Sequence, residues 1–211
     1  MDHALWQGII FFLLFIPSIA FHEYGHAQAA YWLGDDTAKR EGRLTLNPIV
    51  HIDPIGTIAV PLFSIFFISG FALFGWAKPV PFDKRNLRYP RRDDLLITLA
   101  GPGANFLLAF VAMLSLHFID PMGQLYGFVR GFVMLNVFLG VFNLITIIPP
   151  LDGYRVVAAI FNLPESVIYR GGFVWPILLL LLINLPPYRE LLGFIVGMVT
   201  YILSLITFVP V

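Results

Sequence analysis

Three polar residues, His22, Glu23 and His26, stand where the first apolar stretch of this sequence ends. In a helix, residues four positions apart lie on one face, so the two imidazoles can bind one metal ion together. Glu23 stands beside them, where its carboxylate can take a proton from a water molecule that the metal activates. This H-E-x-x-H pattern indicates zinc-dependent hydrolysis of peptide bonds.

The same three residues could instead be satisfied polar groups in a helix bundle or in a transporter cavity. Their place in an apolar stretch disfavours this alternative, because an ionisable residue near the middle of a membrane span costs about 2.5–3.5 kcal/mol. Three such residues within five positions need a strong reason, and metal ligation supplies one. We therefore interpret His22 and His26 as metal ligands and Glu23 as the general base.

A catalytic zinc ion takes three protein ligands and keeps a fourth position open, so two histidines leave it one ligand short. The best candidate for the third ligand is Asp152, in the segment 149–153 (PPLDG), which follows another apolar stretch. An Asp at such a place is more often a cap or turn residue. Together with the histidine motif it becomes the strongest candidate, and we expect one zinc ion per chain.

The elements that must hold these residues are apolar. Of the 211 residues, 58% are hydrophobic and 12% are charged, whereas soluble domains carry about 25% charged residues. Six stretches meet or approach the length of about 20 apolar residues that a helix needs to cross a bilayer. They cover residues 5–21, 55–76, 95–119, 128–148, 173–185 and 191–209. We predict an all-α polytopic membrane protein with about five to six transmembrane helices.

The polar segments between these stretches are too short to form a second core. The two longest, 34–53 and 77–94, have only about 20 residues each. We therefore expect a single domain over 1–211, multi-pass in the lipid bilayer of the cell membrane and without a nucleic-acid partner. Cysteine is absent, which excludes disulfides and thiolate ligands.

Two connecting segments have distinctive patterns. Apolar and polar residues alternate over 42–48 (GRLTLNP), which predicts a short β-strand or hairpin over 42–53 at the membrane face. The apolar segment 55–76 is interrupted by prolines and glycines. The helices that lead to His26 and to Asp152 must run in the same direction if these ligands are to meet. This requires that 55–76 re-enters the membrane and returns rather than spanning it.

The basic residues check this topology independently. With re-entry, 11 of the 13 Lys and Arg residues share one face, and only Arg130 and Arg189 lie opposite. A full span over 55–76 changes the division to 8 against 5. The positive-inside rule favours re-entry, with the active site nearer the cytoplasmic side. The eleven residues are Lys39, Arg40, Arg43, Lys78, Lys84, Arg85, Arg88, Arg91, Arg92, Arg155 and Arg170.

With these motifs, the chain resembles the site-2 protease family of intramembrane zinc metalloproteases, and within it the compact prokaryotic branch that lacks a PDZ or CBS domain. The resemblance extends over residues 21–155 and rests on six ordered blocks. The blocks are 21–27, 42–48, 51–57, 76–81, 100–105 and 143–153. Several blocks in the right order are far more specific than the zinc motif alone.

The resemblance implies cleavage of transmembrane segments, with transmembrane-helix proteins as substrates. It implies zinc ligation by His22, His26 and Asp152, with Glu23 as the base. It also implies that Asn143 and Asn105 bind substrate or stabilise the oxyanion.

One departure concerns Asn143. The family pattern N-x-x-P-x-x-P-x-D-G places its Asn eight residues before the Asp, but Asn143 is nine residues before Asp152. Ile147 replaces the first proline of that pattern. The role of Asn143 therefore follows less directly than that of Asp152.

Two other functions fit part of the pattern. A non-proteolytic metal-binding membrane protein or transporter would also place His and Asp in the bilayer. It needs no carboxylate between the histidines, and no pair of broken helices in two related halves is present. A different H-E-x-x-H membrane peptidase, acting on soluble peptides, is disfavoured by the blocks at 100–105 and 151–153. The natural substrate, the cleaved bond and the oligomeric state are left open.

Overall fold

The computed structural model describes residues 3–67, 75–161, 163, 172 and 174–210. These residues form helices and irregular connections, with no strand among them, which confirms the all-helical class. The chain packs as two compact units, Met1–Arg88 and Tyr89–Val211. That the whole of 1–211 acts as one domain stays a prediction.

The first unit is built on α1 (His3–Trp32), which continues through Pro17 without interruption. Its part Leu5–Trp32 is long and apolar enough to cross a membrane. The helix stops at Gly34, where φ is +105°. The Gly34 N–H donates to the Tyr31 carbonyl and the Asp35 N–H to the Ala30 carbonyl, the two bonds of a Schellman motif. A glycine at this position ends the helix at no steric cost.

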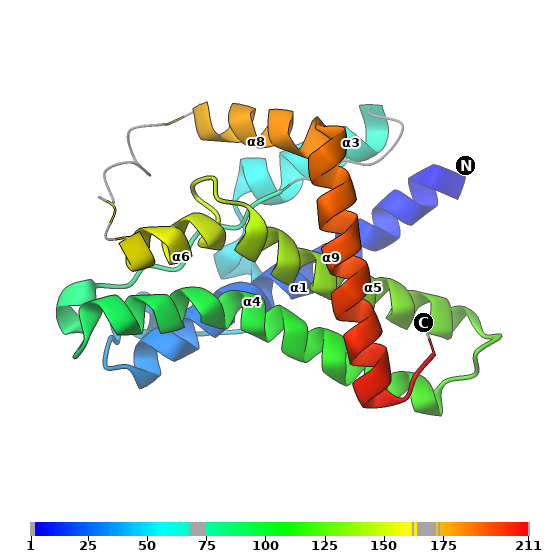
Figure 1. Cartoon of the computed structure of the whole chain (residues 1–211), viewed down its shortest axis with the longest axis horizontal. Helices are drawn as coiled ribbons and strands as arrows, with labels where there is room; N and C mark the ends of the chain where they lie inside the picture. Colours follow the sequence, from blue (N-terminus) through cyan, green and yellow to red (C-terminus); the bar gives the residue numbers. More distant parts are fainter. Residues whose placement is uncertain (1–2, 68–74, 162, 164–171, 173, 211) are drawn as a thin grey trace. The chain divides into compact units, whose positions relative to one another are not determined.

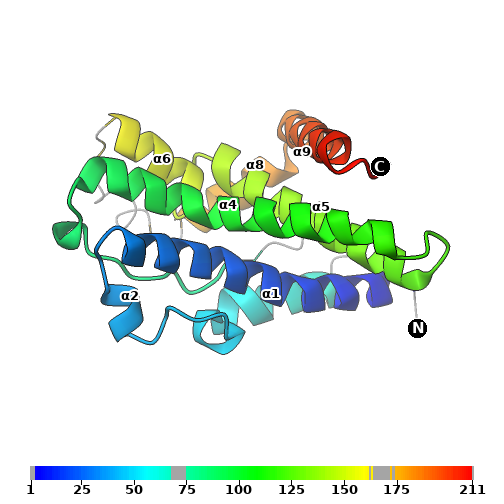
Figure 2. The same ribbon diagram turned by 90° about the horizontal axis from the view of Figure 1, so that it is seen from below.

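Short helices follow α1 in the first unit, and α1 contacts three of them, α2, η1 and α3. Figure 2 shows α2 directly after the end of α1. The short helices are α2 (Thr37–Arg40), the 3₁₀ helix η1 (Pro48–His51), the π-helix η2 (Pro54–Ala59), α3 (Val60–Phe67) and the 3₁₀ helix η3 (Lys84–Asn86).

The side chain of Asp35 ties η3 to the end of α1. Its carboxylate accepts hydrogen bonds from the Thr37 hydroxyl at 2.5 Å, the Asn86 amide at 2.8 Å and the Asp83 N–H at 2.9 Å. Burial alone would raise the pKa of this carboxyl, but these bonds outweigh burial and hold the pKa below its ordinary value. The ionised form of Asp35 therefore stabilises this corner of the unit.

The strand or hairpin expected over 42–53 is not confirmed. Residues 42–47 form turns and bends, and Pro48–His51 is the 3₁₀ helix η1. The Asn47 side chain accepts the Ile49 N–H at 3.1 Å, a capping bond that favours the start of a helix over a ladder. Since Pro48 follows directly and has no N–H, the segment lacks a donor that a paired strand would need.

The segment 55–76, predicted to re-enter the membrane, is described except for residues 68–74. The Thr57 hydroxyl donates to the Trp76 carbonyl at 2.7 Å, and the Trp76 N–H donates to the Gly56 carbonyl at 3.2 Å. These bonds hold the two ends of the segment side by side, as re-entry requires. Whether the segment enters a membrane stays a prediction.

The second unit is a helical hairpin with further helices packed on it. Its helices α4 and α5 run side by side in both views, and α6 and α9 pack against them (Figures 1 and 2). They are α4 (Pro90–Ser115), the 3₁₀ helix η4 (Leu116–Phe118), α5 (Gln124–Ile145), α6 (Asp152–Phe161), α8 (Val174–Asn184) and α9 (Pro186–Thr207).

Four helices in the described residues are long and apolar enough to cross a membrane. Besides Leu5–Trp32 they are Pro90–Phe118, Gln124–Ile145 and Pro186–Thr207. The predicted span 173–185 contains α8, whose 11 residues extend only about 16 Å. A hydrocarbon core is about 30 Å thick, so α8 by itself is too short to cross it. The expected number of five to six spans is therefore not confirmed.

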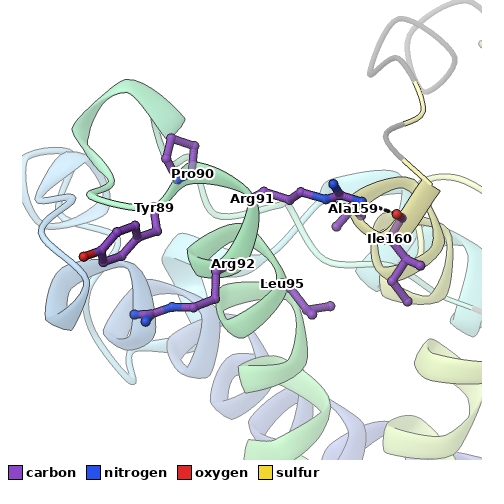
Figure 3. A pocket seen from close by; sticks show the side chains of 7 residues that line it. All are labelled: Tyr89, Pro90, Arg91, Arg92, Leu95, Ala159 and Ile160. Carbon is purple, nitrogen blue, oxygen red and sulfur yellow. Dashed lines mark hydrogen bonds between the residues drawn. The ribbon is translucent and has the colours of Figure 1, made fainter.

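Arg91 joins two helices of the second unit. Its guanidinium, at the first turn of α4, donates to the carbonyls of Ala159 and Ile160 in the last turn of α6 (Figure 3). The last carbonyls of a helix have no partner within it, and they attract cations because of the helix dipole. This contact holds the C-terminal end of α6. The N-terminal residue of the same helix is Asp152.

Candidate metal centre

The imidazoles of His22 and His26 lie together on one face of α1, as their spacing predicts. Their Nε2 atoms are 3.1 Å apart and their ring centroids are 4.7 Å apart. Both side chains are buried, with exposed fractions of 8% and 7%. Two nitrogens bound to one tetrahedral zinc ion at 2.0–2.1 Å would be about 3.3 Å apart. The histidine pair therefore fits a shared zinc ion.

The carboxylate of Glu23 is also buried on α1, and one of its oxygens is held by the main chain. Oε2 accepts the Val80 N–H at 3.0 Å. A bond from a neutral donor to a charged acceptor is stronger than one between neutral groups, so it restrains the side chain. Val80 belongs to the segment 76–81, which runs past this turn of α1.

Packing reinforces this arrangement. Ala27, Ala38 and Val80 form a buried apolar cluster, and Leu44 packs against it. The cluster lies next to His26 in the chain, so it holds the end of the motif and the segment 76–81 together. Sequence reasoning missed the contribution of Val80, because a main-chain donor leaves no signature in residue type. The sequence feature that could have indicated this contact is the block at 76–81, in which prolines stand on both sides of Val80.

Asp152 is the first residue of α6, in the second unit, and 5% of its side chain is exposed. The glycine after it explains how this turn is placed. A Cβ atom on Gly153 would lie 2.5 Å from the Leu144 carbonyl oxygen and 2.7 Å from that of Thr146. No residue with a side chain fits there, so Gly153 allows the start of α6 to dock against the end of α5.

The end of α5 is itself fixed. The Thr146 hydroxyl donates to the Phe142 carbonyl at 2.6 Å and accepts from the Tyr188 hydroxyl at 2.6 Å. Tyr188 belongs to α9, so three helices meet at the turn that leads to Asp152. Asp152 therefore stands on a restrained backbone.

The two asparagines expected near the site also lie in the second unit. Asn143, on α5, donates to the Leu139 carbonyl of its own helix at 2.9 Å. Asn105, on α4, is fully buried and donates to the Asn136 side chain of α5 at 2.9 Å. This bond between α4 and α5 was not anticipated from the sequence, because Asn136 stands in no motif.

The structure thus brings three of the six predicted site residues, His22, Glu23 and His26, together on α1. The other three lie on α4, α5 and α6 of the second unit. The first unit alone provides two imidazoles at metal-ligand spacing and a fixed carboxylate, within a helix apolar enough to span a membrane. These features define an H-E-x-x-H protein of the membrane.

Comparison with curated proteins agrees with this class. "Putative zinc metalloprotease YwhC" of Bacillus subtilis is 42% identical in an alignment of 151 residues that covers 67% of this chain and 64% of that protein. "Putative zinc metalloprotease Rip2" of Mycolicibacterium smegmatis is 32% identical over 153 residues, 72% of this chain and 56% of that protein. "Zinc metalloprotease MJ0392" of Methanocaldococcus jannaschii is 29% identical over 162 residues, 77% of this chain and 37% of that protein.

No family model and no solved structure matches the chain. The chain spans less than two thirds of the length of each of these three relatives. These matches show that the chain is related to zinc metalloproteases, and its six motif blocks resemble those of the site-2 protease family.

Proposed function

We propose that this chain is an intramembrane zinc metalloendopeptidase that cleaves transmembrane segments of other membrane proteins. The observation that carries the proposal is the pair of imidazoles at zinc-ligand spacing, with the Glu23 carboxylate fixed beside them, inside a candidate membrane-spanning helix. Such a helix places hydrolytic groups where a peptide bond is otherwise shielded from water. The helix of a substrate must be partly unwound before its carbonyl is accessible.

In the proposed centre, His22, His26 and Asp152 would hold one zinc ion. The donor set of two imidazoles and one carboxylate is one that catalytic zinc uses. The restrained turn at the start of α6 supports Asp152, because a ligand must be held within a few tenths of an ångström. The ion would supply a water molecule with a pKa near 7 and would polarise the scissile carbonyl.

Glu23 is the general base in this proposal. Since the Val80 N–H holds Oε2, Oε1 is the oxygen that takes the proton from the attacking water. The same carboxyl then gives the proton to the leaving amine. Burial of the side chain keeps bulk water from competing for this proton.

We assign the asparagines more distant roles. A carboxamide has two N–H donors, and Asn143 uses one of them within α5. The second donor can stabilise the oxyanion of the substrate carbonyl. Asn105, fully buried and bonded to Asn136, positions α4 beside α5.

The matched variants Glu23→Gln and Glu41→Gln test the proposal, because Glu41 is an exposed residue of the same unit. Membrane proteomes of cells with wild-type or Glu23→Gln protein identify substrates, which are then cleaved in proteoliposomes. Glu23→Gln should keep about one zinc ion per chain and cleave nothing, while Glu41→Gln behaves as wild type. Near-normal cleavage by Glu23→Gln would refute the mechanism. Zinc binding without any cleavage by the wild type would favour the alternative, a non-proteolytic metal-binding protein or transporter.

The site is expected nearer the cytoplasmic side of a multi-pass cell-membrane protein. This orientation follows from the basic residues and from the positive-inside rule.

A further inference from the structure

We propose that Arg43 is a positioning residue for the general base, acting through the main chain of residues 78–80. The inference rests on the proposed function of Glu23, and it adds a residue that the zinc motif does not include. It begins with an unusual feature of Arg43, which is 6% exposed although its side chain is always charged. A buried cation is costly unless partners compensate for the lost water.

The partners of the Arg43 guanidinium are main-chain carbonyls. Its Nη2 donates to the Lys78 carbonyl at 2.7 Å and, at 3.4 Å, weakly to that of Pro79. In the part of the chain that the structure describes, it forms no ion pair, and its buried Nε has no partner. The Arg43 N–H donates to the Ala38 carbonyl at 2.7 Å, which anchors the residue after α2. The described hydrogen bonds of the side chain are thus directed at the carbonyls of residues 78 and 79.

These two carbonyls immediately precede the donor that holds the base. The Val80 N–H, one peptide further on, donates to Glu23 Oε2. Because Pro79 and Pro81 have no N–H, Val80 is the only main-chain donor in 79–81. The position of the Glu23 carboxylate therefore depends on where Arg43 holds this short stretch.

Other bonds hold the segment further from Glu23. The Lys78 N–H donates to the His51 carbonyl at 2.9 Å, and the Trp76 carbonyl accepts from Thr57. Apart from the bond to Glu23 itself, Arg43 provides the side-chain hydrogen bonds to the main chain that lie nearest to Val80 among those described. Its loss should let the Val80 N–H move while the more distant bonds keep the segment folded. A displacement of about 1 Å near a reacting group can reduce the rate about 10²-fold.

Amide hydrogen exchange tests the contact without any activity. In a peptide of residues 78–81, Val80 carries the single main-chain amide, because Lys78 is the N-terminus and the other two residues are prolines. Exchange at Val80 should be slow in the wild type and at least tenfold faster in Arg43→Gln and in Glu23→Ala. Arg40→Gln is the matched control, because Arg40 is exposed and pairs with Asp36 rather than with 76–81. Equal protection of Val80 in Arg43→Gln and Arg40→Gln would overturn the proposal.

Zinc binding and kinetics separate positioning from loss of the fold. Arg43→Gln should keep its zinc and its KM and lose about 10- to 100-fold in kcat. Arg43→Lys, which can still donate to one carbonyl, should recover part of that loss. Unchanged kcat in Arg43→Gln would contradict the proposal.

A second pair of variants covers the case in which Arg43→Gln does not fold. Val80→Pro removes the donor, whereas Val80→Ala shortens the side chain and keeps the donor. Val80→Ala removes only part of the side-chain packing, so Val80→Pro should reduce kcat well below the value of Val80→Ala. Equal kcat in the two would refute the role of this N–H. If wild-type protein cleaves no substrate, the proposed function fails, yet the exchange rate at Val80 still decides whether Arg43 positions Glu23.

Discussion

Replacement of Gly153 by Ala tests whether the turn before α6 sets the position of Asp152. The new Cβ atom would lie 2.5 Å from the Leu144 carbonyl oxygen, whereas close carbon–oxygen contacts are about 3.3 Å. The three atoms nearest to it all belong to the main chain, so the start of α6 must move by about 0.8 Å. Zinc ligands tolerate about 0.2 Å.

The expected result for Gly153→Ala is a loss of about 10- to 100-fold in zinc affinity, the range for a displaced ligand support. Overpacking should also destabilise the fold by about 1–3 kcal/mol. Gly131→Ala in α5 is the control, because a Cβ atom there meets nothing within 4 Å. Competition with a chromophoric chelator measures zinc affinity in detergent, and thermal unfolding checks the fold. Equal zinc affinities for Gly153→Ala and Gly131→Ala would show that this contact does not position a ligand.

Four further predictions follow from the site and its surroundings. His22→Ala, His26→Ala and Asp152→Ala should each lower zinc content, measured by mass spectrometry, and acid should do so in the wild type because the ligands must be deprotonated. If Asp152→Ala kept the zinc content of the wild type, Asp152 would not be a ligand of the proposed centre. Asn143→Ala should lower turnover by roughly 10²–10³-fold with zinc retained, and Asn105→Ala should lower it less; equal, mild losses would reduce both to structural residues. Asp35→Asn should lower the melting temperature at pH 7, because the pKa of Asp35 lies below its ordinary value of 3.8 and its ionised form is stabilising. This difference should shrink as the pH falls below 3.8 towards the folded-state pKa, and a difference independent of pH would contradict the assignment. Single Cys probes at Lys39 and Lys84 should be labelled from the same side of the membrane, and labelling from opposite sides would exclude re-entry of 55–76.

The features that the sequence predicted correctly are those with local causes. The spacing of His22 and His26 places both imidazoles on one face of any regular helix, whatever surrounds it. The apolar composition indicated helices able to cross a membrane, and four of those described have the necessary length.

Two predictions that rested on local patterns are not confirmed. The alternation over 42–48 is equally compatible with a strand and with an irregular segment. The capping hydrogen bond at Asn47 favours the helix η1 instead of a strand. The predicted span at 173–185 showed only apolar composition, but the helix α8 within it is short. Hydropathy indicates which residues avoid water, but it does not indicate how many of them belong to one continuous helix.

The sequence by itself determined which side chains are candidates for the proposed centre, since residue type and spacing decide which atoms can bind zinc and take a proton. Tertiary structure decided how that chemistry is held. The Val80 N–H reaches Glu23 across 57 positions, and the Asn105 amide reaches Asn136 across 31. Gly153 is needed only because the carbonyls of Leu144 and Thr146 lie against it. Contacts of this kind depend on which segments the fold brings together, and no local preference of the chain specifies them.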